Sequence, residues 1–181
     1  MAIHPTPEAC RALLASHGVP LHICRHSDTV ARLGRGLAEA LVVYAGEPVD
    51  APLVEAAGIL HDIAKANCIV SRGDHAREGG QLLRGLGYAE MAGLVERHVD
   101  LGGWDPAGPV TEAELLNYAD KRVRHDEVVS LQERFRDLLD RYGGTNEKAR
   151  ARIGENWRVM EALEAKIFGR LPFGPDALLE W

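Results

Sequence analysis

The chain has 181 residues, of which 46% are hydrophobic and 27% are charged, and its formal net charge is −6. This composition is ordinary for a globular protein, and the length suits one domain or one domain with an extension. The acidic balance argues against a general nucleic-acid binder, which needs a basic surface. It does not exclude a small anionic substrate, because bound metal ions add local positive charge.

Three cysteines and the absence of long apolar runs bear on the cellular setting. Cys10, Cys24 and Cys68 are odd in number and widely spaced, which is typical of reduced thiols and not of a disulfide framework. Residues 1–8 lack the basic and apolar segments of a signal peptide. No apolar run approaches the ~20 residues that span a bilayer. We therefore expect a cytoplasmic protein without membrane attachment.

Apolar residues recur at three- and four-residue spacings through most of the chain, which predicts amphipathic helices. Residues 1–7 form a lead-in, and a short helix begins after the capping hydroxyl of Thr6 and ends near Ser16. A second helix spans residues 21 to about 45. Its apolar stripe contains Val30, Leu33, Leu37, Ala40, Leu41 and Tyr44.

The middle of the chain predicts four more helices. One begins after the cap Asp50 and carries an apolar face as far as His61. A connection at residues 68–73 leads to a helix capped by Asp74, and a further helix spans residues 88–99. The next helix begins at Thr111, where Glu114 completes a capping box.

A loop at residues 101–109, rich in glycine and proline, separates the last two of these helices. It carries Trp104, which suits either a lid or base-stacking surface, or a hydrophobic plug.

Residues 126–181 are predicted to be a C-terminal extension. Two amphipathic helices, at 126–142 and 146–168, either pack back on the domain or form the seam of a homodimer. Residues 171–181 resemble an irregular docking strap. No segment alternates as a β-strand does, so the predicted fold is all-α. The expected division is an N-terminal segment 1–19, a helical domain 20–125 and this extension.

Imidazole and carboxylate groups fall on the otherwise apolar stripes. His61 and Asp62 end a buried helical face, and an unpaired buried carboxylate would cost several kcal/mol, so Asp62 needs a cation or strong donors. A metal ion satisfies both side chains at once. His26 lies one turn before Val30, and Asp120 lies on an apolar helix face.

Other histidines leave alternatives open. His22 shares the face of His26, and His125 follows the last acid, so either is a further candidate ligand. His75 stands at a helix start, where it is either a ligand or exposed. His98 stands at a helix end, where it is either a ligand or a partner of the helix dipole alone.

The order His, His-Asp, His, His, Asp resembles the HD-domain superfamily of metal-dependent phosphohydrolases. The resemblance covers roughly residues 20–125 and is similar to the dinuclear, HDIG-type members, including bacterial dinucleoside tetraphosphate hydrolases. The gap from His61 to His75 is shorter than in those dinuclear relatives. The sequence segments that carry the resemblance are Arg25-His26-Ser27, Leu60-His61-Asp62-Ile63-Ala64-Lys65 and Tyr118-Ala119-Asp120-Lys121.

This resemblance implies an HD-domain helical bundle with a metal centre. One ion would bind His26, His61, Asp62 and Asp120. A second would bind His75 and His98, with Asp62 as the bridge. Fe or Mn is expected, with Mg, Co, Ni or Zn as further candidates.

The implied reaction hydrolyses a phosphoester or phosphoanhydride of a nucleotide-like small molecule with a metal-activated hydroxide. Asp62 and Lys65 would be the catalytic residues, and Lys65, Lys121 and Arg124 would contact the substrate.

Two other functions are alternatives to hydrolysis. A mixed-valent di-iron oxygenase resembles the same ligand set and would need iron and oxygen. A non-catalytic signalling or interaction module would use the helices as a docking scaffold, although such modules normally lose ligands. No GxxxxGK loop is present, which excludes an ATPase of that type.

Overall fold

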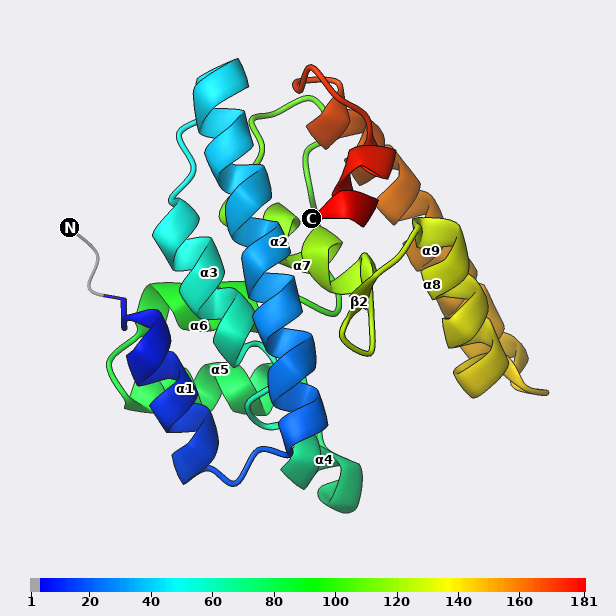
Figure 1. Cartoon of the computed structure of the whole chain (residues 1–181). Helices are drawn as coiled ribbons and strands as arrows, with labels where there is room; N and C mark the ends of the chain where they lie inside the picture. The colour runs from blue at the N-terminus through cyan, green and yellow to red at the C-terminus, as the bar shows by residue number, and fades with distance from the viewer. Residues whose placement is uncertain (1–3) are drawn as a thin grey trace.

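The computed structural model describes residues 4–181 and is built almost entirely of helices (Figure 1). The lead-in predicted for residues 1–7 therefore lies partly outside the described residues. In chain order the α-helices are α1 (Pro7–Ser16), α2 (Leu21–Ala45), α3 (Ala51–Leu60), α4 (Lys65–Ser71), α5 (His75–Gly85), α6 (Ala89–Glu96), α7 (Glu112–Lys121), α8 (Leu131–Leu138) and α9 (Glu147–Phe168). The all-α prediction is confirmed.

The shorter elements lie in the C-terminal third of the chain. Strands β1 (Val123–Arg124) and β2 (Glu127–Val128) pair as an antiparallel hairpin. A π-helical turn, η1 (Leu139–Gly143), continues α8, and a 3-10 helix, η2 (Pro175–Glu180), ends the described chain. No helix among residues 4–181 is long and apolar enough to cross a bilayer.

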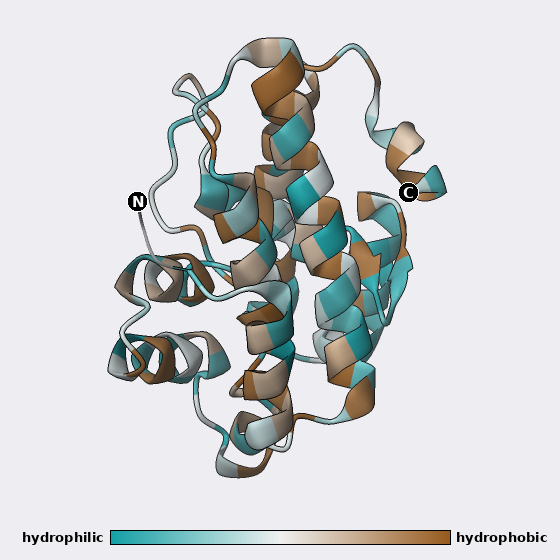
Figure 2. Cartoon of the chain, turned by 60° about the vertical axis from the view of Figure 1, so that its left-hand side comes forward, coloured by the Kyte–Doolittle hydropathy of each residue, from teal (hydrophilic) through white to brown (hydrophobic). Residues whose placement is uncertain are grey.

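The helix starts follow from local chemistry. Asp50 accepts a hydrogen bond from Leu53 N at the start of α3, and Thr111 and Glu114 form the predicted capping box of α7. Hydrophobic and hydrophilic residues alternate around the helices (Figure 2), as expected for rods that each bury one face. Thr6 and Asp74 also cap helices, as predicted.

Helix α2 is the long rod on which α3 and α7 pack (Figure 1). Its crossing with α3 is close, since a Cβ atom at Gly58 would lie only 2.6 Å from Ala31 Cα. Any larger residue there must push the two helices apart. This approach brings His61, at the end of α3, beside His26 of α2, with ring centres 5.3 Å apart.

Three sequence-based boundaries were wrong. Residues 65–71 form α4, although a connection was predicted at residues 68–73. The helix predicted for 126–142 begins at Leu131, because residues 123–128 form the hairpin. The helix predicted for 88–99 ends at Glu96. The hairpin shows no alternating sequence pattern because contacts with another element hold it. The Thr29 hydroxyl of α2 donates a hydrogen bond to Asp126 O, between the two strands.

The C-terminal extension packs back on the bundle, and ion pairs join the two parts. Lys166 Nζ of α9 lies 2.7 Å from Glu114 Oε1 of α7, and both side chains are buried. Arg122 Nη1, just after α7, lies 3.0 Å from Glu164 Oε2 of α9. Within this chain the extension therefore contacts α7, while the division into domains and the homodimer seam stay predictions.

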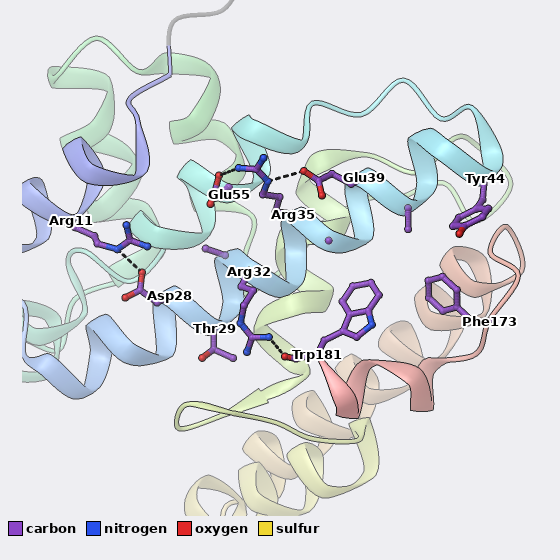
Figure 3. A pocket seen from close by; sticks show the side chains of 13 residues that line it. Arg11, Asp28, Thr29, Arg32, Arg35, Glu39, Tyr44, Glu55, Phe173 and Trp181 are labelled. Carbon is purple, nitrogen blue, oxygen red and sulfur yellow. Dashed lines mark hydrogen bonds and ion pairs between the residues drawn. The ribbon is translucent and has the colours of Figure 1, made fainter.

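The loop at 101–109 and the C-terminal tail also contact the bundle. Trp104 packs against the core with the Lys166 ammonium 5.6 Å from its ring centre, which supports the plug interpretation. Leu178 is buried, and Arg32 of α2 donates to the backbone oxygen of Trp181 (Figure 3). Residues 171–181 therefore contact the bundle, although residues 175–180 form η2 and not the irregular segment that the sequence predicted.

Replacing Gly58 by Ala tests the close helix crossing. The added methyl overlaps Ala31, so we expect a loss of about 1–3 kcal/mol in the free energy of unfolding, the usual cost of overpacking. Urea unfolding followed by circular dichroism measures it. Gly93→Ala is the control. No heavy atom lies within 4 Å of its added Cβ, so the free energy of unfolding of that variant should not fall. Equal free energies of unfolding for Gly58→Ala and wild type would contradict the close approach of α2 and α3 at Gly58.

Candidate metal centre

His26 enters the centre from α2 and is held from both sides of its ring. Its Nδ1 lies 2.7 Å from His125 O, and its Nε2 lies 3.0 Å from Asp120 Oδ1 of α7. His22, one turn earlier, is exposed. The structure therefore brings His26 and not His22 into the cluster, while His125 takes part through its backbone carbonyl.

His61 stands at the C-terminal end of α3 and is fully buried. Its Nδ1 lies 2.7 Å from Gly58 O. Its Nε2 lies 3.4 Å from Asp62 Oδ2 and 3.7 Å from Asp120 Oδ1. The ring therefore faces two carboxylates, one from the turn after α3 and one from α7.

Asp62 presents its two carboxylate oxygens to different sets of histidines. Oδ2 lies 3.4 Å from His61 Nε2, while Oδ1 lies 3.4 Å from His75 Nε2 and 3.6 Å from His98 Nε2. The side chain is 1% exposed. Burial alone would raise the pKa of Asp62, but His61 and the Lys65 ammonium outweigh it and hold the pKa well below its usual value.

His75 and His98 form the outer part of the cluster. His98 is buried after the end of α6, with Nδ1 2.6 Å from Val95 O. His75 begins α5 and is partly exposed, and burial lowers its pKa to about 4. It is therefore neutral at pH 7. The His75 and His98 ring centres are 5.1 Å apart.

The backbone sets the tautomers of three of these rings. A carbonyl oxygen can only accept, so the Nδ1 atoms of His26, His61 and His98 must carry the protons that they share with carbonyl oxygens. Each Nε2 then faces the carboxylates, and in a neutral imidazole its lone pair is free to bind a cation placed between them. This is the arrangement of metal-binding histidines, in which an outer-shell acceptor fixes the ring.

Two buried polar atoms indicate that the cluster fits a cation. Among residues 4–181, His61 Nε2 and Asp62 Oδ1 are buried and have no hydrogen-bond partner. Leaving such groups unsatisfied costs about 1–3 kcal/mol each. The ligand atoms of His26, His61 and Asp62 lie within 4.8 Å of one another, and so do those of Asp62, His75 and His98. Both groups suit a divalent ion with nitrogen and oxygen ligands.

The three predicted cations take different positions. Lys65 Nζ lies 2.6 Å from Asp62 Oδ2, and its side chain is 38% exposed, so it reaches both the cluster and solvent. Lys121 is buried, with Nζ 2.5 Å from Asp120 Oδ2 and 3.2 Å from His98 O. Arg124 lies in the hairpin and is partly buried.

Lys121 affects the ionisation of its neighbour. Burial raises the pKa of Asp120, and the Lys121 ammonium and the His26 hydrogen bond reverse this and hold the pKa well below its usual value. Asp120 is therefore an ionised carboxylate facing His26 and His61.

Sequence reasoning missed the carbonyl groups that orient the rings. Gly58 and His61, like Val95 and His98, stand three residues apart, and that helical spacing is a local signal for such a bond. The His125 carbonyl gave no signal. It lies 99 positions from His26 and depends on a left-handed residue, with φ 58° at His125.

A separate groove of about 980 Å³ lies between α2 and the C-terminal tail (Figure 3). Its lining includes Arg11, Arg32, Arg35 and Trp181, and none of the six candidate ligands. The guanidinium groups of Arg11 and Arg35 pair with carboxylates there. The groove is therefore distinct from the histidine and aspartate cluster.

Comparison with known proteins gives a family match. The model of the family described as HD domain matches residues 23–142. Neither a curated protein nor a solved structure matches the chain. The matched segment contains all six candidate ligands and continues through α8 into η1.

Divalent metal should stabilise the folded protein through this cluster. With free Mn²⁺ at about 100 times its dissociation constant, the expected gain is ~2.7 kcal/mol. For a chain of this size the melting temperature should rise by roughly 5–10 °C. Asp62→Asn should abolish the shift, since it removes an anionic ligand of both groups. His22→Ala, an exposed control, should retain it. Scanning calorimetry with and without metal is the measurement, and an equal shift in Asp62→Asn would contradict this assignment.

Proposed function

This chain belongs to the HD domain family, whose members are mostly metal-dependent hydrolases, and we propose that it is a metal-dependent phosphohydrolase of small phosphorylated molecules. The observation that carries the proposal is the Asp62 carboxylate. Its two oxygens face separate sets of histidines, and the Lys65 ammonium stands beside it. The substrate that we propose is a phosphoester or phosphoanhydride of a nucleotide-like molecule.

We propose a dinuclear centre of the HDIG type. His26, His61 and Asp120 would hold one ion, and His75 and His98 the other. Asp62 would bridge the two. The near contacts of Asp62 Oδ2 with His61, and of Oδ1 with His75 and His98, support this division. Imidazole and carboxylate ligands favour Fe or Mn.

The bound ions would lower the pKa of water and neutralise charge on a phosphoryl group. The chain's own residues supply position and charge. Three carbonyl groups hold the rings so that their Nε2 atoms face the carboxylates. Lys121 keeps Asp120 ionised. Lys65 is exposed enough to donate to an arriving phosphoryl oxygen, where a fixed positive charge stabilises developing negative charge.

Further parts of the proposal concern the whole chain. We propose a catalytic HD domain at residues 20–125 between the segment 1–19 and the extension 126–181, and a cytoplasmic location. Arg124 and Lys121, which follow Asp120 closely in the sequence, would add positive charge near the substrate. A homodimer formed through the extension belongs to the same proposal.

Replacing Asp62 by Ala tests the function. Changes in groups that only orient metal ligands typically cost 10–100-fold, so loss of the bridging carboxylate should lower kcat/KM by more than about 100-fold. The assay is phosphate release from a panel of nucleotides and dinucleotides with Mn²⁺, without oxygen. His22→Ala is the matched control and should keep wild-type turnover.

Two outcomes of this assay would contradict the proposal. Unchanged turnover in Asp62→Ala would remove the cluster from the reaction. Product formation that needs oxygen and bound iron, with no hydrolysis under Mn²⁺, would favour the di-iron oxygenase.

A further inference from the structure

His98 lies in the bend that follows α6, so the helix itself does not fix its whole backbone. Its ring is held on one side, because Nδ1 lies 2.6 Å from Val95 O. Carbonyl groups at and beyond the end of a helix have no partner within that helix, and they need donors from elsewhere. The position of His98 therefore depends on what its own carbonyl, and that of Arg97 before it, contact.

Both of these carbonyl groups accept hydrogen bonds from the side chain of Asn117 on α7. Asn117 Nδ2 lies 2.9 Å from Arg97 O and 2.9 Å from His98 O. An amide nitrogen carries two hydrogens, so it can donate one to each carbonyl. The Asn117 side chain is buried, with 1% of the residue exposed. The two bonds thus tie the segment that carries His98 to α7 at successive residues.

Lys121 lies one turn after Asn117 and donates to the same carbonyl of His98. Its Nζ lies 3.2 Å from His98 O and 2.5 Å from Asp120 Oδ2. Side chains four positions apart on a helix share one face. This face of α7 therefore contacts the backbone of His98 with two donors, while Asp120 faces the other part of the cluster from the same helix.

The third polar atom of the Asn117 amide is not satisfied. Its Oδ1 is buried and, within residues 4–181, has no hydrogen-bond partner. The cost of burying such an oxygen is similar to the net gain from two neutral hydrogen bonds. We therefore expect the side chain to add little net stability, and its main effect to be on the position of the two carbonyl groups.

We infer that Asn117 is a positioning residue for His98 and, through His98, for the ion that His98 shares with His75 and Asp62. This inference rests on the proposed dinuclear centre. Residues that hold a metal-binding histidine in place typically contribute about 10–100-fold to metal affinity. The rings of His26 and His61 are held by other carbonyl groups, so the ion at those ligands does not depend on Asn117.

The test is Asn117→Leu, which keeps the branched shape of the side chain and removes both donors. Calorimetric titration with Mn²⁺ measures the affinities of the two ions. The variant should bind one ion about tenfold or more weaker than wild type and the other within about twofold of wild type. Without metal, its melting temperature should lie close to that of wild type. If Asn117→Leu does not fold, Asn117→Ala removes the same donors without added bulk.

Asn156→Leu is the matched control. Asn156 Nδ2, from α9, lies 3.4 Å from Val99 O, the carbonyl that follows His98, and the residue is partly exposed. This control should bind both ions as wild type does. Asn117→Gln keeps both amide hydrogens, so it should bind the weakened ion more tightly than Asn117→Leu does.

The His98→Ala background separates a positioning role from a purely structural one. An effect that acts through His98 disappears once that ligand is removed. Asn117→Leu should therefore leave the affinity of the remaining Mn²⁺ unchanged in His98→Ala. A purely structural role would weaken the remaining ion there, and in the wild-type background it would weaken both ions to the same extent. Either result would overturn the inference.

Failure of this inference differs from failure of the proposed function. Two ions bound by Asn117→Leu as tightly as by wild type, together with hydrolysis by wild type, would overturn the inference and leave the function standing. An ion whose affinity depends on Asn117, without hydrolysis of any substrate, would support the inference and count against the function. A single Mn²⁺ in wild type would overturn the inference.

Discussion

A buried carboxylate at the end of α3 sets the requirement that the surrounding structure meets. Asp62 is almost completely removed from solvent, and an ionised carboxylate is stable there only if positive charge or hydrogen-bond donors surround it. Lys65 satisfies one oxygen. The other oxygen faces the Nε2 atoms of His75 and His98 and, among the described residues, has no hydrogen-bond partner. A cation shared between neutral imidazoles resolves this imbalance, and four separate helices are positioned to provide them.

Rigidity explains how distant segments hold that geometry. The crossing of α2 and α3 at Gly58 places two ring centres 5.3 Å apart, and α7 brings Asp120 to the same point. Carbonyl acceptors then lock the rings, so few side-chain rotations are left to be lost when a ligand binds. The buried pair of Glu114 and Lys166 fixes α9 against α7. The extension therefore supports the helix that carries Asp120.

The sequence was informative where structure depends on local chemistry. Capping residues such as Asp50 and Thr111, together with apolar periodicity, predicted most helix starts, and an acid on an apolar stripe predicted Asp62 and Asp120 as members of the cluster. The hairpin and the His125 carbonyl depend on contacts with α2, formed between residues about 100 positions apart.

The metal content of the protein tests the central claim most directly. Elemental analysis of protein purified without chelators should find about two divalent ions per chain, as expected for a carboxylate that bridges a pair of ions. The double variant His75→Ala/His98→Ala should retain about one, because His26, His61, Asp62 and Asp120 remain. One ion per chain in wild type, or two ions unaffected by the double variant, would contradict the account of Asp62 as a bridge.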